Sequence, residues 1–285
     1  MRAPRAALRS GAFTLRRWSA RFRVLPDFVI IGAQRAGTTS LYHYLVQHPC
    51  VAPPLRKEVH FFDFAYDNGP DWYLAHFPTI MDRALHRFFK GSCYVTGEAS
   101  PYYLFHPHVP ARLAELLPGA KLIVMIRNPA DRAISHYHRE RMKGREPLSL
   151  VEAIECEERR LAAEAEARVP DPLFQGSEHH RHSYLARGRY AEQLGRWLRH
   201  FPREQICVVP AEHLFRDPAQ TYRSILEFLG LPMWEPPSYS RQNPGVYGDV
   251  DPAIRARLIE YFKPHNRRLY DLLNQDLGWD GPGES

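Results

Sequence analysis

The segment 32–40, GAQRAGTTS, holds the residues with the clearest chemical potential: two glycines, one arginine and three consecutive hydroxyl side chains. It follows the apolar run 28–31 and precedes a helical pattern, which predicts a strand, a turn and a helix start. Such a turn surrounds a phosphate with backbone N–H groups and a helix N-terminus. The spacing is close to that of an ATP-binding P-loop, G-x-x-x-x-G-K-[ST], but Thr38 stands at the lysine position and the basic residue is Arg35. We therefore expect a phosphate-binding loop without ATPase or kinase chemistry; an ordinary strand–turn–helix connection is the alternative.

A second candidate is the pair Glu58 and His60 in the segment 57–63, KEVHFFD, which we expect to be a short extended segment. Alternate residues of an extended chain point to the same face. A carboxylate and an imidazole on a common face can accept a proton from a hydroxyl group. The alternative is that Glu58 is a solvated residue at a strand edge. Phe61 and Phe62 are expected in the core.

A third candidate follows the apolar run 121–126, KLIVMI, which predicts a fully buried strand. Arg127 comes directly after this strand, and its planar guanidinium suits a phosphate. Asn128 is a good N-cap and Pro129 fits the first turn of a helix. Ser135 would lie about two turns into that helix, where its hydroxyl can donate one hydrogen bond. The alternative for Arg127 is a surface ion pair.

Strand-like apolar runs alternate with helical patterns along the chain. We predict strands at 28–31, 121–126 and 205–210, and further helices at 38–48, 107–117, 149–167, 190–200, 218–229 and 252–273. This alternation indicates a mainly parallel central sheet flanked by helices on both faces. The fold class is therefore α/β, with a single P-loop-like domain over residues 25–280. Ligands of such sheets bind at the carboxyl ends of the strands, where both phosphate-type motifs lie.

The chain has 285 residues and a formal net charge of +6, which favours anionic ligands such as nucleotides or sulfated sugars. Residues 1–24 contain seven arginines and no acidic residue. We interpret them as a mobile basic tail. A membrane-surface helix, which would make peripheral membrane contact, and an organelle-targeting segment are the alternatives. No DNA- or RNA-reading motif accompanies the basic residues, so we expect no nucleic-acid partner.

The cysteines and histidines are the candidate metal ligands of this sequence. The four cysteines are widely spaced and form no C-x-x-C pair, which argues against a zinc site and favours a reduced, cytoplasmic protein: Cys50, Cys93, Cys156 and Cys207. A histidine cluster occurs in the segment 169–183, which we expect to be a loop and a candidate lid: His179, His180 and His182. Its loop context favours a solvated or acceptor-facing cluster over a metal site.

Four segments together resemble the sulfotransferases that use 3′-phosphoadenosine 5′-phosphosulfate (PAPS), and within them the heparan-sulfate-type branch and its bacterial relatives. These segments are GAQRAGTTSL (32–41), KEVHFFD (57–63), IRNPADRAISHY (126–137) and YFKPHNRRLY (261–270). The resemblance covers roughly residues 26–280. It implies transfer of a sulfuryl group from PAPS to an acceptor hydroxyl, most simply on a carbohydrate or glycan, by in-line displacement without a metal.

The resemblance also implies roles for matching positions. The loop residues that would hold the 5′-phosphosulfate are Arg35, Ala36, Gly37, Thr38, Thr39 and Ser40. Arg127 and Ser135 would hold the 3′-phosphate. Glu58 would be the general base, with His60 as a nearby helper, and Arg35 would neutralise charge on the leaving phosphate.

Three positions depart from the family pattern. Arg35 stands where the family usually has a catalytic lysine; it supplies positive charge but cannot donate a proton. Ala99 replaces a lysine that often follows the glutamate matching Glu98. The segment 241–247, RQNPGVY, replaces a K-G-R-type loop on the adenosine side, and its residues that could shape a loop over the 3′-phosphate are Asn243, Gly245 and Tyr247.

Two other functions are compatible with the sequence. A nucleotide enzyme using ATP is disfavoured by the missing P-loop lysine. A catalytically silent module that binds an anionic glycan or a nucleotide is suggested by Arg35 and Ala99.

Overall fold

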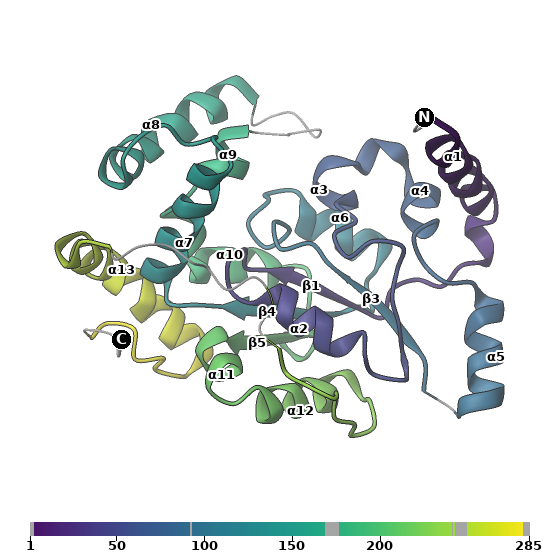
Figure 1. Ribbon diagram of the computed structural model, residues 1–285. Helices are drawn as coiled ribbons and strands as arrows, with labels where there is room; N and C mark the ends of the chain where they lie inside the picture. The colour runs from purple at the N-terminus through teal and green to yellow at the C-terminus, as the bar shows by residue number, and fades with distance from the viewer. Residues whose placement is uncertain (1–2, 92, 169–176, 241, 243–249, 282–285) are drawn as a thin grey trace.

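A central parallel sheet organises the protein (Figure 1). The computed structural model describes residues 3–91, 93–168, 177–240, 242 and 250–281. Within them the strand order is β2-β3-β1-β4-β5, and every pairing is parallel. The strands are β1 (Phe28–Gly32), β2 (Val51–Ala52), β3 (Val95–Ala99), β4 (Lys121–Ile126) and β5 (Ile206–Pro210). The predicted fold class, an α/β domain with a parallel sheet, is confirmed.

The sheet is enclosed by helices, and Figure 1 shows them on both of its sides. All five residues of β1 are buried, as are the last five of β4, which is why both strands are continuous apolar runs without alternation. The longer helices are α1 (Ala3–Trp18), α2 (Thr38–Leu45), α5 (Ile80–Lys90), α6 (Val109–Leu116), α7 (Pro129–Met142), α8 (Leu150–Arg168), α10 (Tyr190–Trp197), α12 (Pro218–Leu229) and α13 (Pro252–Leu273). Short helices are α3 (Phe61–Phe64), α4 (Pro70–Leu74), α9 (Ser177–Arg181) and α11 (Ala211–Arg216).

The helices and strands that were predicted are found at or near their predicted bounds, whereas helix α5 was not predicted. The bounds of β4, α12 and α13 agree with the prediction, and Asn128 caps α7 by accepting a 3.0 Å hydrogen bond from the N–H of Ala130. Helix α2 ends at Leu45, three residues before the predicted end. In the predicted loop 169–183, residues 177–181 form α9, while 169–176 lie outside the described residues.

The prediction of an extended segment at 57–63 is wrong at its end. His60 has a positive φ of 56° and turns the chain into the short helix α3. Phe61 and Phe62 are buried in the core as predicted. The strands β2 and β3 were not predicted, because β2 has only two residues and β3 has the sequence VTGEA, which lacks a continuous apolar run.

The N-terminal region differs from the predicted mobile tail. Residues 3–18 form α1, and the described side chains at its C-terminal end contact α4 and the chain after it. The Phe13 ring lies 4.9 Å from the His76 ring. The Arg16 guanidinium donates hydrogen bonds to the carbonyls of Ala75 (2.6 Å) and Phe77 (2.8 Å). None of the helices in the described residues is both long and apolar enough to cross a membrane.

Two of the cysteines are not reduced. Cys50 and Cys93 form a disulfide, with their Cα atoms 5.4 Å apart, so the expectation of four free thiols is wrong for this pair. The two residues are 43 positions apart in the chain, and their local sequences gave no pairing signal. A cytoplasmic location stays a prediction.

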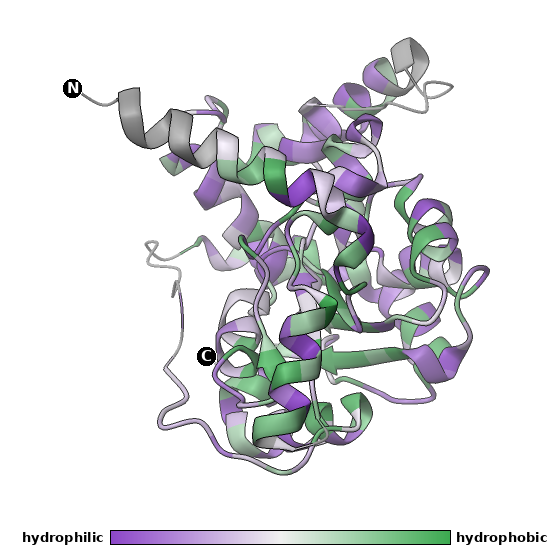
Figure 2. Ribbon diagram, turned by 90° about the vertical axis from the view of Figure 1, so that its right-hand side faces the viewer, coloured by the Kyte–Doolittle hydropathy of each residue, from purple (hydrophilic) through white to green (hydrophobic). Residues whose placement is uncertain are grey.

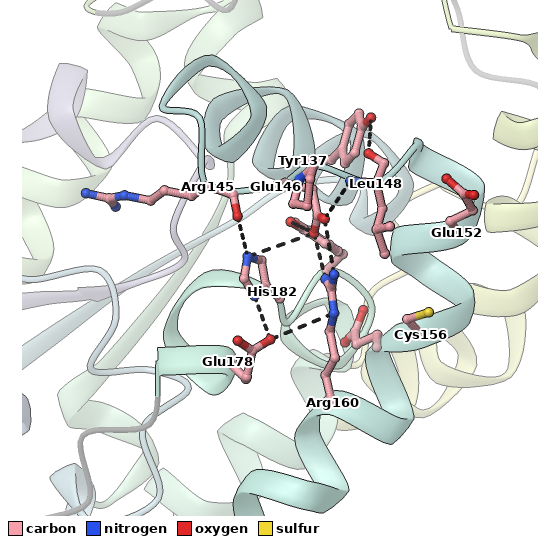
Figure 3. A network of polar contacts seen from close by, with 12 residues as sticks. Tyr137, Arg145, Glu146, Leu148, Glu152, Cys156, Arg160, Glu178 and His182 are labelled. Carbon is pink, nitrogen blue, oxygen red and sulfur yellow. Dashed lines mark hydrogen bonds and ion pairs between the residues drawn. The ribbon is translucent and has the colours of Figure 1, made fainter.

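A buried carboxylate joins α8 and α9 to the end of α7 (Figure 3). Glu146 follows α7, and its side chain accepts hydrogen bonds from Arg160 of α8 (2.7 and 3.2 Å) and from the Tyr184 hydroxyl (2.8 Å). His182 bonds Glu178 of α9 at 2.7 Å. Burial raises the pKa of Glu146, but the bonds from Arg160 and Tyr184 outweigh it and lower the pKa below its ordinary value. The Arg160 guanidinium also pairs with Glu178 at 3.9 Å, which connects α9 to α8.

We expect Glu146→Gln to lower the free energy of unfolding by about 2–4 kcal/mol at pH 7, because it leaves Arg160 without its buried partner. The folded-state pKa of Glu146 is depressed, so its stabilisation is present above the unfolded value of about 4.5 and is lost as the pH falls below it. Urea unfolding at pH 7 and pH 4 measures both effects. Glu155→Gln is the matched control: it breaks the exposed pair with Arg257 and should cost less than about 1 kcal/mol. Equal losses in the two variants would contradict this account.

Candidate active site

A pocket of about 560 Å³ lies at the carboxyl ends of β1 and β4. Most of the predicted site residues line it: Arg35, Gly37, Thr38, Thr39, Ser40, Glu58, His60, Arg127 and Ser135. Ala36 is fully buried and does not line the pocket. Asn243, Gly245 and Tyr247 lie outside the described residues. The structure thus brings three separate sequence segments to one place.

The loop between β1 and α2 has the geometry of an anion cradle. Gly37 adopts a φ of 84°, and a Cβ there would lie 3.1 Å from the Phe215 ring, so both conformation and space favour glycine. Helix α2 begins directly afterwards at Thr38. Its first N–H groups have no acceptor within the helix, and the positive end of the helix dipole lies at the pocket. An anion can bind there.

Two arginines meet beside this loop. The Arg35 Nε donates a 3.0 Å hydrogen bond to the Ser135 hydroxyl, which lies on α7 and is buried. Arg127, one residue beyond β4, donates from its guanidinium to the Arg35 carbonyl at 3.4 Å. The Tyr190 hydroxyl donates to the carbonyl of Arg127 at 2.9 Å and fixes its backbone. The loop, the end of β4 and α7 therefore present charge and hydroxyl donors to one space.

Glu58 and His60 lie at the pocket as part of a three-residue array. The His60 ring bonds the Glu58 carboxylate through Nε2 (3.3 Å) and the Asp63 carboxylate through Nδ1 (2.7 Å). Burial lowers the pKa of His60, but the bonds to Asp63 and Glu58 outweigh it and raise the pKa to about 10. The bond from His60 is the main cause that lowers the pKa of Glu58 to about 2. The array is therefore an imidazolium between two carboxylates at neutral pH.

Lys57 is a site residue that the sequence analysis missed. Its ammonium group donates to the Thr39 hydroxyl at 2.8 Å and to Glu58 at 3.0 Å. It thereby links the anion cradle to the carboxylate. Its position next to Glu58 in the sequence was the available signal.

The backbone of this segment is anchored by a fully buried carboxylate, that of Glu98 on β3. One oxygen accepts hydrogen bonds from the Val59 N–H (3.1 Å) and the Ser100 hydroxyl (2.7 Å). The Ser100 oxygen in turn accepts from the His60 N–H at 3.2 Å. The other oxygen of Glu98 accepts from the hydroxyls of Tyr73 (2.9 Å) and Tyr103 (3.2 Å). Burial raises the pKa of Glu98 to about 7 despite these donors.

Helices α7 and α9 form the opposite wall. Arg139 of α7, Lys143 directly after α7 and His180 of α9 line the pocket. Burial, with the nearby charge of Arg187, lowers the pKa of His180 to about 3, so this imidazole is neutral. Arg187 is buried, bonds the Gln34 side chain, and donates to the His180 carbonyl at 2.6 Å. It connects this wall to the loop after β1.

The other two histidines of the cluster have separate partners. The His179 ring stacks on Phe105 at 4.1 Å and bonds the Tyr102 hydroxyl at 2.7 Å, whereas His182 belongs to the network around Glu146. Across the residues with assigned structure, no group of three potential metal-ligating side chains was found. The pocket chemistry present is that of cations, hydroxyls and a carboxylate–imidazole array.

We expect Asp63→Asn to lower the pKa of His60 from about 10 toward its ordinary value of 6.5, because it removes the stronger of the two anionic partners. A proton-NMR titration of the His60 ring measures this directly. The raised pKa stabilises the fold below pH 6.5, and this stabilisation is lost as the pH rises toward 10. The stability difference between wild type and His60→Gln should shrink over the same range. Asp67→Asn, at an exposed position, is the control; an unchanged His60 titration in Asp63→Asn would refute the assignment.

The sequence and the fold are similar to those of known sulfotransferases. A family model described as "Sulfotransferase domain" matches residues 25–241. A crystal structure of a sulfotransferase from Alicyclobacillus acidocaldarius is 34% identical, with a TM-score of 0.68, over 90% of this chain and 100% of that one. The human heparan sulfate glucosamine 3-O-sulfotransferase 3A1 is 30% identical over 90% of this chain, and the membrane-associated sulfotransferase kil1 of Dictyostelium discoideum is 27% identical over 90%. The chain spans 66% of the length of kil1 and 63% of the human protein.

Proposed function

Because this chain belongs to the sulfotransferase domain family, we propose that it transfers a sulfuryl group from PAPS to a hydroxyl of a glycan. The observation that carries the proposal is the juxtaposition of an anion cradle with a carboxylate. Arg35, Arg127 and the start of α2 converge in one pocket, and Glu58 lies on its wall. The two halves of the reaction, binding a phosphorylated donor and deprotonating a hydroxyl, thus have their residues side by side.

The residues present fit the phosphate groups of PAPS, which supplies the sulfuryl group when bound. The first turn of α2 and Arg35 would hold the 5′-phosphosulfate, and Arg127 with Ser135 would hold the 3′-phosphate. Arg35 would keep positive charge beside the bridging oxygen as the sulfur–oxygen bond breaks. Its guanidinium does not donate a proton, and a phosphate leaving group at neutral pH hardly needs one.

Glu58 would accept the proton of the acceptor hydroxyl as that oxygen attacks sulfur. A carboxylate with a pKa of about 2 is ionised at neutral pH but is a weak base. A polyanionic donor bound beside it would raise this pKa, since a nearby negative charge disfavours the ionised form. Lys57 would supply a cation near the reacting atoms, where Ala99 supplies none.

A glycan acceptor is supported by two observations. Several relatives are named as heparan sulfate sulfotransferases, including the human and mouse 3-O-sulfotransferases at 30–31% identity. Arg139 and Lys143 place further positive charge on the pocket wall, which favours an acceptor carrying carboxylate or sulfate groups. The silent binding module is the alternative, and it predicts donor binding without transfer.

We expect Arg127→Ala to weaken binding of adenosine 3′,5′-bisphosphate by about 10- to 100-fold, the effect of losing a charge-assisted hydrogen bond. Isothermal titration calorimetry without magnesium measures the dissociation constant. Arg223→Ala is the matched control, because that arginine pairs with Glu235 on the exposed surface. Absence of binding by the folded wild-type protein would overturn the proposed function.

We expect Glu58→Gln to lower kcat for sulfuryl transfer by about 10²- to 10⁴-fold, as for loss of a general base. Binding of adenosine 3′,5′-bisphosphate should not weaken, because in this proposal Glu58 contacts the acceptor and its negative charge opposes an anionic donor. Transfer from labelled PAPS to desulfated heparan sulfate measures the rate. Glu260→Gln, which alters an exposed carboxylate on α13, is the control. Donor binding by the wild type with no transfer to any glycan would favour the silent module.

A further inference from the structure

Helix α5 has an apolar half that faces outward. At 100° per residue, its apolar side chains fall within one half of the helix: Ile80, Met81, Ala84, Leu85, Phe88 and Phe89. The large ones are 53%, 65%, 49%, 82% and 74% exposed, in chain order. The helix start is fixed by a capping box in which Thr79 and Asp82 bond each other reciprocally. An ordinary surface helix buries such a half against the core.

The polar half of α5 faces the protein instead. Arg83 forms a 3.1 Å ion pair with Asp27 and lies over the Tyr94 ring at 5.7 Å. The His86 ring contacts the same tyrosine at 5.0 Å. Because these contacts hold the polar half of α5 against the protein, the apolar half on the opposite side faces outward.

The N-terminal segment, which is bridged to the residue before α5, carries two further exposed apolar side chains. An antiparallel bridge pairs Arg23 with Thr79, the residues that adjoin Phe22 and Ile80 in the chain. Phe22 is 54% exposed and Trp18, at the end of α1, is 82% exposed. Figure 1 shows α1 and α5 along the same side of the molecule, and Figure 2 turns that side toward the viewer. We name the set Trp18, Phe22, Ile80, Met81, Leu85, Phe88 and Phe89 the α5 surface.

The charge around the α5 surface is positive. Residues 11–25, whose side chains the structure describes, contain four arginines and no acidic residue. The Arg21 guanidinium lies over the Phe22 ring at 4.7 Å, and Arg87 is exposed on α5. Exposed aromatic side chains flanked by arginines suit the interface of a membrane that carries anionic lipid. A second copy of the chain would bring two basic surfaces together, which like charge disfavours.

We propose that the α5 surface docks the protein on the headgroup layer of an anionic membrane. The apolar rings enter the boundary between headgroups and acyl chains, and the arginines pair with lipid phosphates. Docking of this kind lies in the plane of the interface and needs no membrane-spanning segment.

Cosedimentation of the full chain with lipid vesicles tests this proposal. We expect binding to phosphatidylcholine vesicles that contain about 30% phosphatidylglycerol, a fraction that gives a clear negative surface charge. Binding to phosphatidylcholine alone should be much weaker. Phe88→Ser/Phe89→Ser should reduce the partition coefficient by at least about tenfold, because two buried rings are lost from the interface. Met233→Ser, an exposed apolar residue elsewhere, is the matched control. Arg21→Glu/Arg87→Glu should remove the dependence on anionic lipid.

Three results would overturn the proposal: no binding of wild type to anionic vesicles, equal binding by Phe88→Ser/Phe89→Ser, or a dimer in sedimentation velocity that this variant dissociates without any vesicle binding. The altered side chains are exposed, so the variant should fold, and circular dichroism checks this. Binding of adenosine 3′,5′-bisphosphate by the same variant should match wild type. Failure of membrane docking is thereby distinguished from failure of the proposed enzymatic function.

Discussion

Parallel pairing of β1 with both of its neighbours is the constraint on which the pocket depends. In the register of the sheet, Phe28 lies opposite Gly97 of β3 and opposite Lys121 of β4. The three strands therefore run to the same edge, and each one delivers its following segment there: the anion cradle, Ser100 and Arg127. Gly97 permits the close pairing, because a Cβ at this position would lie 2.4 Å from the carbonyl oxygen of Phe28.

The same edge holds a fully buried carboxyl group, that of Glu98, whose desolvation is offset in part by local hydrogen bonds. Burying an isolated carboxylate is costly, and Glu98 reduces that cost by accepting four hydrogen bonds. One donor is the N–H of Val59, and another, the Ser100 hydroxyl, also accepts from the N–H of His60. The bonds that compensate Glu98 therefore also fix the backbone on both sides of Val59. An apolar residue at position 98 would leave the N–H of Val59 and the Ser100 hydroxyl without this acceptor.

Sequence patterns predicted those parts of the molecule whose signal is local. The anion cradle was predicted because glycines and hydroxyls stand at fixed spacing, and β4 because its apolar run is unbroken. Strand β3 was missed, since pairing with β1 and not its own composition makes it a strand. Lys57 and Arg187 were missed because their contacts are with residues 18 and 153 positions away. The orientation of α5 is equally nonlocal: its amphipathic pattern is visible in the sequence, but the contacts of Arg83 decide which half faces outward.

The distribution of charge separates the two tasks of the proposed reaction. In the segment 57–63, Lys57 and the His60 imidazolium balance the carboxylates of Glu58 and Asp63. On the cradle side, Arg35 and Arg127 add two guanidinium groups that keep their charge at any physiological pH. A phosphorylated donor would therefore meet excess positive charge, whereas an acceptor hydroxyl would approach a region of balanced charge. The two cations beside Glu58 each bond a second partner as well: Lys57 bonds Thr39, and His60 bonds Asp63. Their charge is therefore not directed at Glu58 alone.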